Sequence, residues 1–299
     1  MKILLTGSSG FLGKFICEQL NHENEIFELS RNSCTYKCSL DKEIPSFNHS
    51  FDLVIHAAGK AHSVPKTETQ KKEFYNVNVL GTKNLLKGLE NSTIPKEFVF
   101  ISSVAVYGQE IGKEIDENFI LGATDPYGLS KIEAEKVVSK WCKERNVICT
   151  ILRLPLLVGE NAPGNLGSMV SAIDKGYYFN VAGGKARKSM VLAKDVASII
   201  IKGAKIGGTY NLTDGCHPTF NDLSAAISIN MNKKKPKNLS MNLALFIGKF
   251  GDFFGKRAPI NTSKVRKMTS DLTFNDNKAK MLFDWKPQSV IDYINNNKI

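Results

Sequence analysis

The sequence predicts an α/β protein: a doubly wound parallel sheet with a smaller, discontinuous C-terminal lobe. Two observations predict this fold. Short apolar runs alternate with stretches of helical spacing through residues 1–155, which is the pattern of a parallel sheet covered by helices on both faces. After Pro155 the pattern becomes irregular, with glycine-rich loops and short strands. At 299 residues the chain can form one or two domains, and its 42% hydrophobic and 23% charged residues are ordinary for a globular protein.

Five apolar runs are the expected strands of the sheet. They are Lys2–Thr6, Glu25–Leu29, Leu53–Ala58, Glu97–Ser103 and Val147–Leu154.

The first of these runs enters a helix through a glycine-rich turn. Gly7 permits the tight turn, Gly10 lets a ligand approach the backbone, and Gly13 lets the helix pack close to the sheet. Backbone N–H groups and the positive end of a helix meet at such a turn, where a pyrophosphate can bind. The spacing is G-x-x-G-x-x-G, which differs from the commoner G-x-G-x-x-G. The turn predicts a dinucleotide site.

The end of the second run bears on the type of dinucleotide. An acidic residue there selects NAD, whereas an arginine accepts the 2′-phosphate of NADP. This run ends in Ser30 and Arg31, and Glu28 is expected inside the strand. We therefore expect NAD(P) as the cofactor, with a preference for NADP. The alternative is that Arg31 is merely solvated.

Tyr127 and Lys131 stand four residues apart, so they share one face of the expected helix. An ammonium beside a phenol favours the phenolate, which makes Tyr127 a usable acid or base near neutral pH. The run Glu97–Ser103 brings the hydroxyls of Ser102 and Ser103 to the carboxyl end of the sheet, where ligands bind in open α/β folds.

These motifs resemble the extended short-chain dehydrogenase/reductase superfamily, in its sugar-nucleotide epimerase/dehydratase branch. The resemblance runs nearly end to end and implies a Rossmann fold for the sheet. It rests further on D-L-V-I-H-A-A-G at 52–59, N-V-L-G-T-K-N-L at 78–85, S-V-A-V-Y-G at 103–108 and L-F-D-W-K-P at 282–287.

The resemblance implies a catalytic set of Ser103, Tyr127 and Lys131. Tyr127 exchanges the proton of a sugar hydroxyl, Ser103 holds that hydroxyl, and Lys131 also holds the nicotinamide ribose. The expected substrate contacts are Ser103, Val104, Tyr127, Asn165, Lys188 and Arg266, with Lys267 an equal candidate to Arg266. The expected cofactor contacts are Gly7, Ser9, Gly10, Phe11, Leu12, Gly13, Ser30, Arg31, Ser39, Leu40, Ala57, Ala58, Gly59, Asn78, Tyr127, Lys131 and Pro155.

Two domains follow from these assignments. We expect residues 1–155 to form the dinucleotide-binding domain, to which part of 185–212 returns, and residues 156–299 to form mainly a substrate-binding lobe. The substrate is expected in the cleft between them.

Three functions remain open from the sequence. The first is an epimerase acting at C4 of a diphosphate-linked sugar or amino sugar, in the synthesis of surface polysaccharide precursors. The second is an NADPH-dependent 4-keto-6-deoxy-sugar-nucleotide reductase, and the third is a non-catalytic NADP-binding regulator, against which the intact Ser, Tyr and Lys argue. Sugar 4,6-dehydration is disfavoured, because Val104 and Ala105 stand where dehydratases of this branch carry an acid and a base.

Composition limits the partners and the location. The net charge of +11 allows nucleic-acid binding, but no nucleic-acid motif supports it, and a diphosphate substrate is a sufficient anionic partner. The six cysteines lack metal spacing and are expected to be reduced thiols. The sequence shows no signal peptide, so we expect a cytoplasmic protein, with a second copy of the chain as a further candidate partner.

The segment Leu243–Phe254 has two interpretations. It can close the substrate lobe as a helix, with Phe246, Phe250, Phe253 and Phe254 in the core. Alternatively it is a surface patch that touches an anionic membrane weakly, a contact that suits a sugar carried on a polyprenyl diphosphate. Basic residues at headgroup level would then be Lys249, Lys256 and Arg257.

Overall fold

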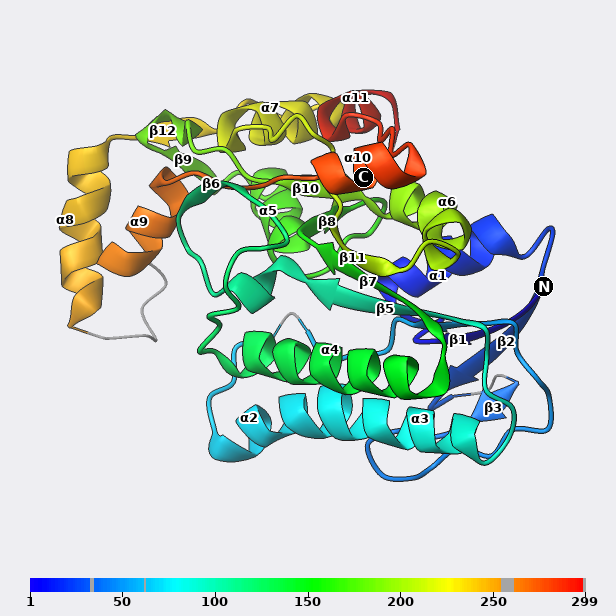
Figure 1. The fold of residues 1–299 in the computed structure, drawn as a ribbon. Helices are drawn as coiled ribbons and strands as arrows, with labels where there is room; N and C mark the ends of the chain where they lie inside the picture. Colours follow the sequence, from blue (N-terminus) through cyan, green and yellow to red (C-terminus); the bar gives the residue numbers. More distant parts are fainter. Residues whose placement is uncertain (33–34, 62, 254–260, 298–299) are drawn as a thin grey trace.

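The computed structural model describes residues 1–32, 35–61, 63–253 and 261–297. Its centre is a seven-stranded sheet in the order β11-β7-β5-β4-β1-β2-β3, and every pairing in it is parallel (Figure 1). The doubly wound parallel sheet predicted from the sequence is confirmed. Its strands are β1 (Lys2–Thr6), β2 (Glu25–Ser30), β3 (Tyr36–Lys37), β4 (Leu53–His56), β5 (Glu97–Ser103), β7 (Ile148–Leu154) and β11 (Gly208–Asn211).

Helices cover both faces of the sheet because successive strand residues point to opposite sides. Ile3 and Leu5 of β1 join the core formed with helices α1 and α6, whereas Leu4 joins the core formed with α3 and α4. The helices on the first face are α1 (Phe11–Leu20), α6 (Ala193–Ala204) and α10 (Asn277–Phe283), and those on the second are α2 (Glu68–Tyr75), α3 (Gly81–Glu90) and α4 (Pro126–Arg145). A π-helical turn, η1 (Asn76–Leu80), joins α2 to α3.

The later part of the chain contributes to the sheet as well as to a second group of elements. Strand β11 pairs with β7, and α6 packs against α1. The division into two domains stays a prediction. The remaining elements are η2 (Val104–Tyr107), β6 (Gly112–Ile115), β8 (Leu156–Val158), α5 (Gly164–Asp174), β9 (Phe179–Val181), η3 (Ala182–Gly184), β10 (Met190–Leu192), α7 (Phe220–Asn230), β12 (Lys237–Leu239), α8 (Met241–Asp252), α9 (Thr262–Thr269), β13 (Leu272–Phe274) and α11 (Val290–Asn296).

Helix α8 lies at the edge of the molecule beside α9 (Figure 1). The interpretation that placed its phenylalanines in the core is wrong for three of them, because Phe246, Phe250 and Phe253 are 59%, 58% and 89% exposed. The buried side of α8 carries small residues instead. Phe254, Lys256 and Arg257 lie outside the described residues. In the described part of the chain, every helix is too short or too polar to cross a membrane.

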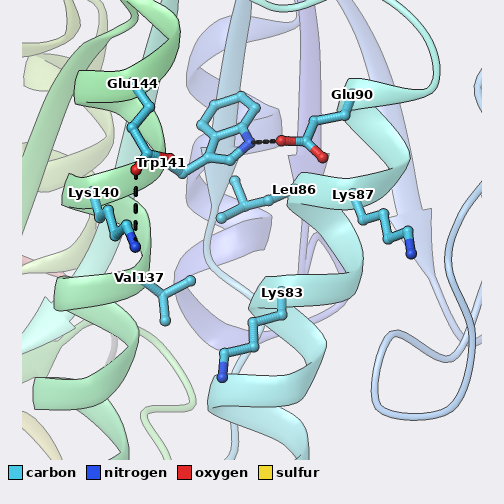
Figure 2. A pocket seen from close by; sticks show the side chains of 8 residues that line it. All are labelled: Lys83, Leu86, Lys87, Glu90, Val137, Lys140, Trp141 and Glu144. Atoms are coloured by element: carbon cyan, nitrogen blue, oxygen red, sulfur yellow. Dashed lines mark hydrogen bonds and ion pairs between the residues drawn. The ribbon is translucent and has the colours of Figure 1, made fainter.

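A shallow groove runs between α3 and α4 on the outer helix layer (Figure 2). Trp141 Nε1 donates a hydrogen bond of 3.0 Å to Glu90 Oε1 across it, and Lys140 lies 3.8 Å from Glu144. The groove has a charged rim, and none of the predicted site residues lines it. The chemistry must therefore be sought at the sheet edge.

Candidate active site

The glycine turn after β1 has the geometry that its spacing predicts. Gly7 has a φ of +76°, and a Cβ there would lie 2.6 Å from the backbone nitrogen of Ala58. A Cβ on Gly13 would lie 2.7 Å from Cα of Ser8, so this position also excludes a side chain. The residues after β4, Ala57 and Ala58, are thus packed directly against the turn.

The start of helix α1 is open to an anion. The N-cap residue, Gly10, makes no side-chain hydrogen bond to the helix, and the first turn contains no acidic residue. The first N–H groups and the positive end of the helix are therefore available to bind an anion. Ser9 and Gly10 are exposed, whereas the Leu12 side chain is buried in the core. These residues fit a dinucleotide pyrophosphate, with Leu12 contributing its backbone.

The end of strand β2 adjoins the same turn. The N–H of Gly7 donates to the carbonyl of Leu29 at 3.4 Å, which brings Ser30 and Arg31 next to the glycines. Arg31 is exposed, and Ser30 Oγ accepts from the N–H of Asn32 at 3.2 Å. A positive charge therefore stands where the strand end meets a dinucleotide ribose in this type of fold.

Ser39 and Leu40 follow β3 at the sheet edge. Leu40 is buried, and Ser39 donates its N–H to Glu43 Oε1 at 2.8 Å. The Ser39 side chain is half-buried.

Asn78 ties two predicted cofactor segments together. Its Oδ1 accepts from the N–H of Lys60 at 2.6 Å, and its Nδ2 donates to the carbonyl of Lys60 at 3.1 Å and to Ser130 Oγ at 2.8 Å. The loop that begins at Gly59 is thereby fixed to helix α4. The side-chain amide of Asn78 is thus bonded to protein groups of both segments, and its contact with the cofactor stays a prediction.

Ser103 and Tyr127 lie near each other at the carboxyl end of the sheet, where the Ser103 side chain is close enough to lower the pKa of the phenol. Ser103 ends β5, and Tyr127 lies in the first turn of α4. Asp125 caps this helix by accepting from the N–H groups of Tyr127 and Gly128, both at 3.1 Å. The cap fixes the helix start and therefore the position of the phenol.

The Nζ atom of Lys131 is buried, one turn along α4 from Tyr127. It donates to the carbonyl of Ile101 at 2.8 Å and lies 4.8 Å from the ring centroid of Phe100. A Cβ on Gly59 would lie 3.3 Å from Nζ, so the lysine adjoins the predicted nicotinamide segment. Burial lowers the pKa of Lys131 to about 8, although Glu135 acts in the opposite direction.

The pKa of Tyr127 departs from the sequence expectation. Burial raises the pKa, the neighbouring Ser103 hydroxyl lowers it, and the nearby carboxylate of Asp125 raises it. The spacing of Tyr127 and Lys131 in the sequence predicts instead a decrease caused by the ammonium. In the structure that ammonium is directed at Ile101 and Phe100, so desolvation of the phenolate has the larger effect.

Comparison with known proteins agrees with this geometry. Residues 3–212 match the family described as the NAD dependent epimerase/dehydratase family. The chain belongs to this family. The resemblance expected from the sequence is thus confirmed, and so is an enzyme of the extended short-chain dehydrogenase/reductase type that uses NAD(P).

Two curated relatives match this chain along nearly its whole length. N-acetyl-alpha-D-glucosaminyl-diphospho-ditrans,octacis-undecaprenol 4-epimerase of Escherichia coli O157:H7 is 29% identical, covering 93% of this chain and 88% of the relative. UDP-glucose 4-epimerase of Vibrio cholerae is 26% identical, covering 97% and 92%. The solved UDP-N-acetylglucosamine 4-epimerase from Bacillus cereus has a TM-score of 0.73 at 22% identity, covering 99% of this chain and 97% of that one, which supports the same fold.

A buried network of hydrogen bonds and one ion pair lies beside the candidate active site, and it was not predicted from the sequence. Arg153 and Glu135 form a bidentate ion pair, in which Nε donates to Oε1 at 3.1 Å and Nη2 donates to Oε2 at 2.7 Å. Glu135 Oε1 also accepts from Ser102 Oγ at 2.5 Å. Arg153 Nη1 donates to Tyr107 Oη at 3.1 Å, and Tyr107 donates to Asn211 Oδ1 at 2.8 Å. One signal was available, because Glu135 follows Lys131 by one helical turn.

The buried side chain of His56 has a structural role next to this site. Its Nε2 donates to Thr82 Oγ1 at 2.9 Å, since Thr82 uses its own proton on the carbonyl of Asn78 at 2.6 Å. Its Nδ1 then accepts from Thr6 Oγ1 at 2.6 Å. Burial, with help from the charge of Lys131, lowers the pKa of His56 to about 3. The imidazole is therefore neutral and fully bonded.

The expected substrate residues are more dispersed. Lys188 is half-buried, and burial lowers its pKa while Asp271 raises it. Arg266 and Asn165 are exposed on α9 and in the first turn of α5. Lys267, the equal candidate to Arg266, forms an ion pair with Glu110 at 2.5 Å. Among the described residues, no hydrogen bond or ion pair joins Asn165 or Arg266 to Ser103, Tyr127 or Lys131.

Two further predicted contacts lie close to the strand ends. Val104 opens η2 directly after Ser103, and Pro155 links β7 to β8; both are half-buried. Phe11 packs on Phe15 with ring centroids 5.4 Å apart, and a Cβ on Gly159 would lie 3.2 Å from its ring. The start of α1 and the segment after β8 are therefore in contact.

Proposed function

We propose that this chain is an NAD(P)-dependent 4-epimerase of a diphosphate-linked sugar. One observation carries the proposal: Ser103, Tyr127, Lys131 and the glycine turn lie at the same edge of the sheet. Two relatives that match along most of the chain are both 4-epimerases, which supports C4 as the reacting carbon.

The residues present fit the cofactor. Gly7, Gly10 and the start of α1 would hold the pyrophosphate, and Lys131 would hold the nicotinamide ribose beside Gly59. When bound, NAD(P) supplies a hydride acceptor that can return the hydride to either face of the sugar. Arg31 supports a preference for NADP, which remains part of the proposal.

The protein residues handle the proton. Tyr127 Oη takes the proton of the C4 hydroxyl and later gives it back, while the Ser103 hydroxyl holds the sugar oxygen. Burial favours the protonated phenol, which suits the return step. The first step requires the phenolate, and we propose that the ammonium of Lys131, held by the carbonyl of Ile101 one helical turn from Tyr127, favours it as the smaller of the two effects.

The substrate is proposed to carry a diphosphate between the sugar and its carrier. Lys188 and Arg266 are candidates for that group, because guanidinium and ammonium groups match phosphate oxygens. The carrier is a nucleotide or a polyprenyl chain, and both kinds occur among the relatives. Either carrier is consistent with precursor synthesis for a surface polysaccharide.

A second candidate, a 4-keto-sugar reductase, is favoured by one observation. The exposed Arg31 at the end of β2 suits NADPH, which a reductase consumes, whereas an epimerase begins and ends its cycle with the oxidised cofactor.

Turnover with defined substrates tests the proposal. The purified protein is incubated with UDP-glucose, UDP-N-acetylglucosamine and N-acetylglucosaminyl-diphospho-polyprenol, and separately with NADPH and a 4-keto-6-deoxy-sugar nucleotide; the C4 epimer is measured together with NADPH absorbance. Interconversion without net NADPH oxidation is the expected result. Stoichiometric NADPH oxidation with the 4-keto sugar would instead establish the reductase, and cofactor binding without interconversion of any of the three sugars would contradict the proposed epimerase activity on them.

A further inference from the structure

Helix α8 is attached to the protein by its smallest residues. Ala244, Gly248 and Gly251 are its buried positions, and a Cβ on Gly248 would lie 3.1 Å from the backbone nitrogen of Thr262. The carboxylate of Asp252 accepts from the N–H of Thr262 at 3.1 Å and from its hydroxyl at 2.8 Å. Close backbone contact and these two bonds dock α8 onto the start of α9 in one orientation.

The opposite side of α8 is apolar and exposed. Phe246, Phe250 and Phe253 follow the spacing i, i+4, i+7, which places them on one helix face. Leu243, 48% exposed, extends this face by one turn, and the rings of Phe246 and Phe250 are 4.9 Å apart. We call these four residues the aromatic face. Amphipathic helices of globular proteins normally bury such residues, and a contiguous exposed apolar patch marks an interaction site.

The surroundings of the aromatic face are basic. Residues 233–253 contain five lysines and one carboxylate, Asp252, which is bonded to Thr262. Four of these lysines, together with Lys175, line a groove of about 360 Å³ beside β12, the strand that leads into α8 (Figure 1). Asp174 also lines the groove and forms an ion pair with Lys233 at 2.9 Å, so the other lysines carry its excess positive charge. The lysines of the groove are Lys175, Lys233, Lys234, Lys235 and Lys237.

We propose that the aromatic face is a docking surface for an anionic lipid bilayer. The phenylalanines enter the boundary between headgroups and acyl chains, and Lys249 with the groove lysines interacts with the anionic headgroups. Protein–protein interfaces are depleted in lysine, so this composition favours a bilayer over a second copy of the chain. A helix of 12 residues is too short to span the bilayer and would lie in its surface.

The proposal stands independently of the epimerase reaction, because it concerns a surface that carries none of the catalytic residues. If both hold, the site can act on a sugar whose carrier remains in the membrane. A vesicle-binding measurement without substrate separates the two, since it does not require turnover.

The test is co-sedimentation of the full chain with vesicles. We expect binding to vesicles of phosphatidylglycerol and phosphatidylcholine at low salt, weaker binding at high salt, and little binding to phosphatidylcholine alone. The triple variant Phe246→Ser, Phe250→Ser, Phe253→Ser should lose binding by at least about tenfold. The matched control Ile120→Ser removes a side chain that is 76% exposed elsewhere and should bind like the wild type.

Three outcomes overturn the proposal. One is wild-type protein that stays in the supernatant at low salt, and another is a triple variant that binds like the wild type. The third is a wild-type dimer, measured by light scattering, that becomes a monomer in the triple variant without any vesicle binding; the aromatic face would then join two copies. Circular dichroism of each variant establishes that it is folded.

Discussion

The candidate active-site edge of the sheet and helix α8 bury opposite kinds of residue. At the sheet edge the buried groups include Lys131, Glu135 and Arg153, and hydrogen bonds or ion pairs join them to the protein. On α8 the buried residues are small, and the phenylalanines face outward. Both regions reverse the usual distribution of polar and apolar residues. In the first region the reversal builds a reaction site, and in the second it provides a surface.

Loss of the phenol should have the largest effect. Tyr127→Phe is expected to lower turnover by about 10²–10⁴-fold while cofactor binding is largely retained, because only the proton carrier is removed. Steady-state kinetics and cofactor titration measure both quantities. Tyr75→Phe alters an exposed tyrosine and serves as the control. Turnover within about threefold of wild type in Tyr127→Phe would exclude its role.

The supporting network should be costly to break. Arg153→Leu leaves Glu135 buried without its partner, so we expect a loss of about 3–5 kcal/mol in the free energy of unfolding. Arg145→Leu removes an ion pair with Glu90 that is partly exposed, and we expect about 0–1 kcal/mol. Urea denaturation of both variants gives the comparison. Equal losses of unfolding free energy in the two variants would show that the buried ion pair stabilises the fold no more than the exposed one.

The depressed pKa of Lys131 gives two opposite pH dependences. If the ammonium is required, kcat/KM should fall about tenfold per pH unit above about 8, where the lysine loses its proton. Folding stability relative to Lys131→Met should instead rise between about pH 8 and 10.5, because the unfolded chain then binds more protons than the folded one. A kcat/KM profile that stays flat to pH 10 would contradict the first expectation, and a stability difference without pH dependence would contradict the second.

The two sides of α8 should respond differently to similar changes. Gly248→Leu forces a side chain against the start of α9 and should destabilise that contact by about 1–3 kcal/mol. Phe250→Leu keeps an apolar residue on the exposed side and should stay within about 0.5 kcal/mol. Thermal unfolding and limited proteolysis measure the effects. Reversed sensitivities would mean that the aromatic face is packed in solution.

Cofactor preference should show the smallest change. Arg31→Asp replaces a cation by a carboxylate that repels a 2′-phosphate and accepts from a 2′-hydroxyl, so the ratio of NADP to NAD affinity should fall by about tenfold or more. Lys87→Asp makes the same charge change at an exposed position on α3 and should leave the ratio unchanged. An unaltered ratio in Arg31→Asp would place Arg31 in solvent.

Patterns local in the chain were sufficient to predict the sheet, the glycine turn and the helix that carries both Tyr127 and Lys131. Strand alternation, a positive-φ glycine and helical spacing are properties of short segments, so they can be recognised without tertiary contacts. The hydrogen bonds of the Asn78 amide could not be predicted in this way, because its partners, Lys60 and Ser130, belong to distant segments.

Spacing within single elements was sufficient to predict the fold class and the family, and it supplied the candidate catalytic residues. The direction of the Tyr127 pKa shift depends on tertiary contacts, because the surrounding residues determine both the desolvation of the phenol and the position of the Lys131 ammonium. Tertiary contacts also determine which side of α8 is buried. An amphipathic pattern states that a helix has two faces, but the neighbour that packs against it, here the start of α9, determines which face meets the solvent.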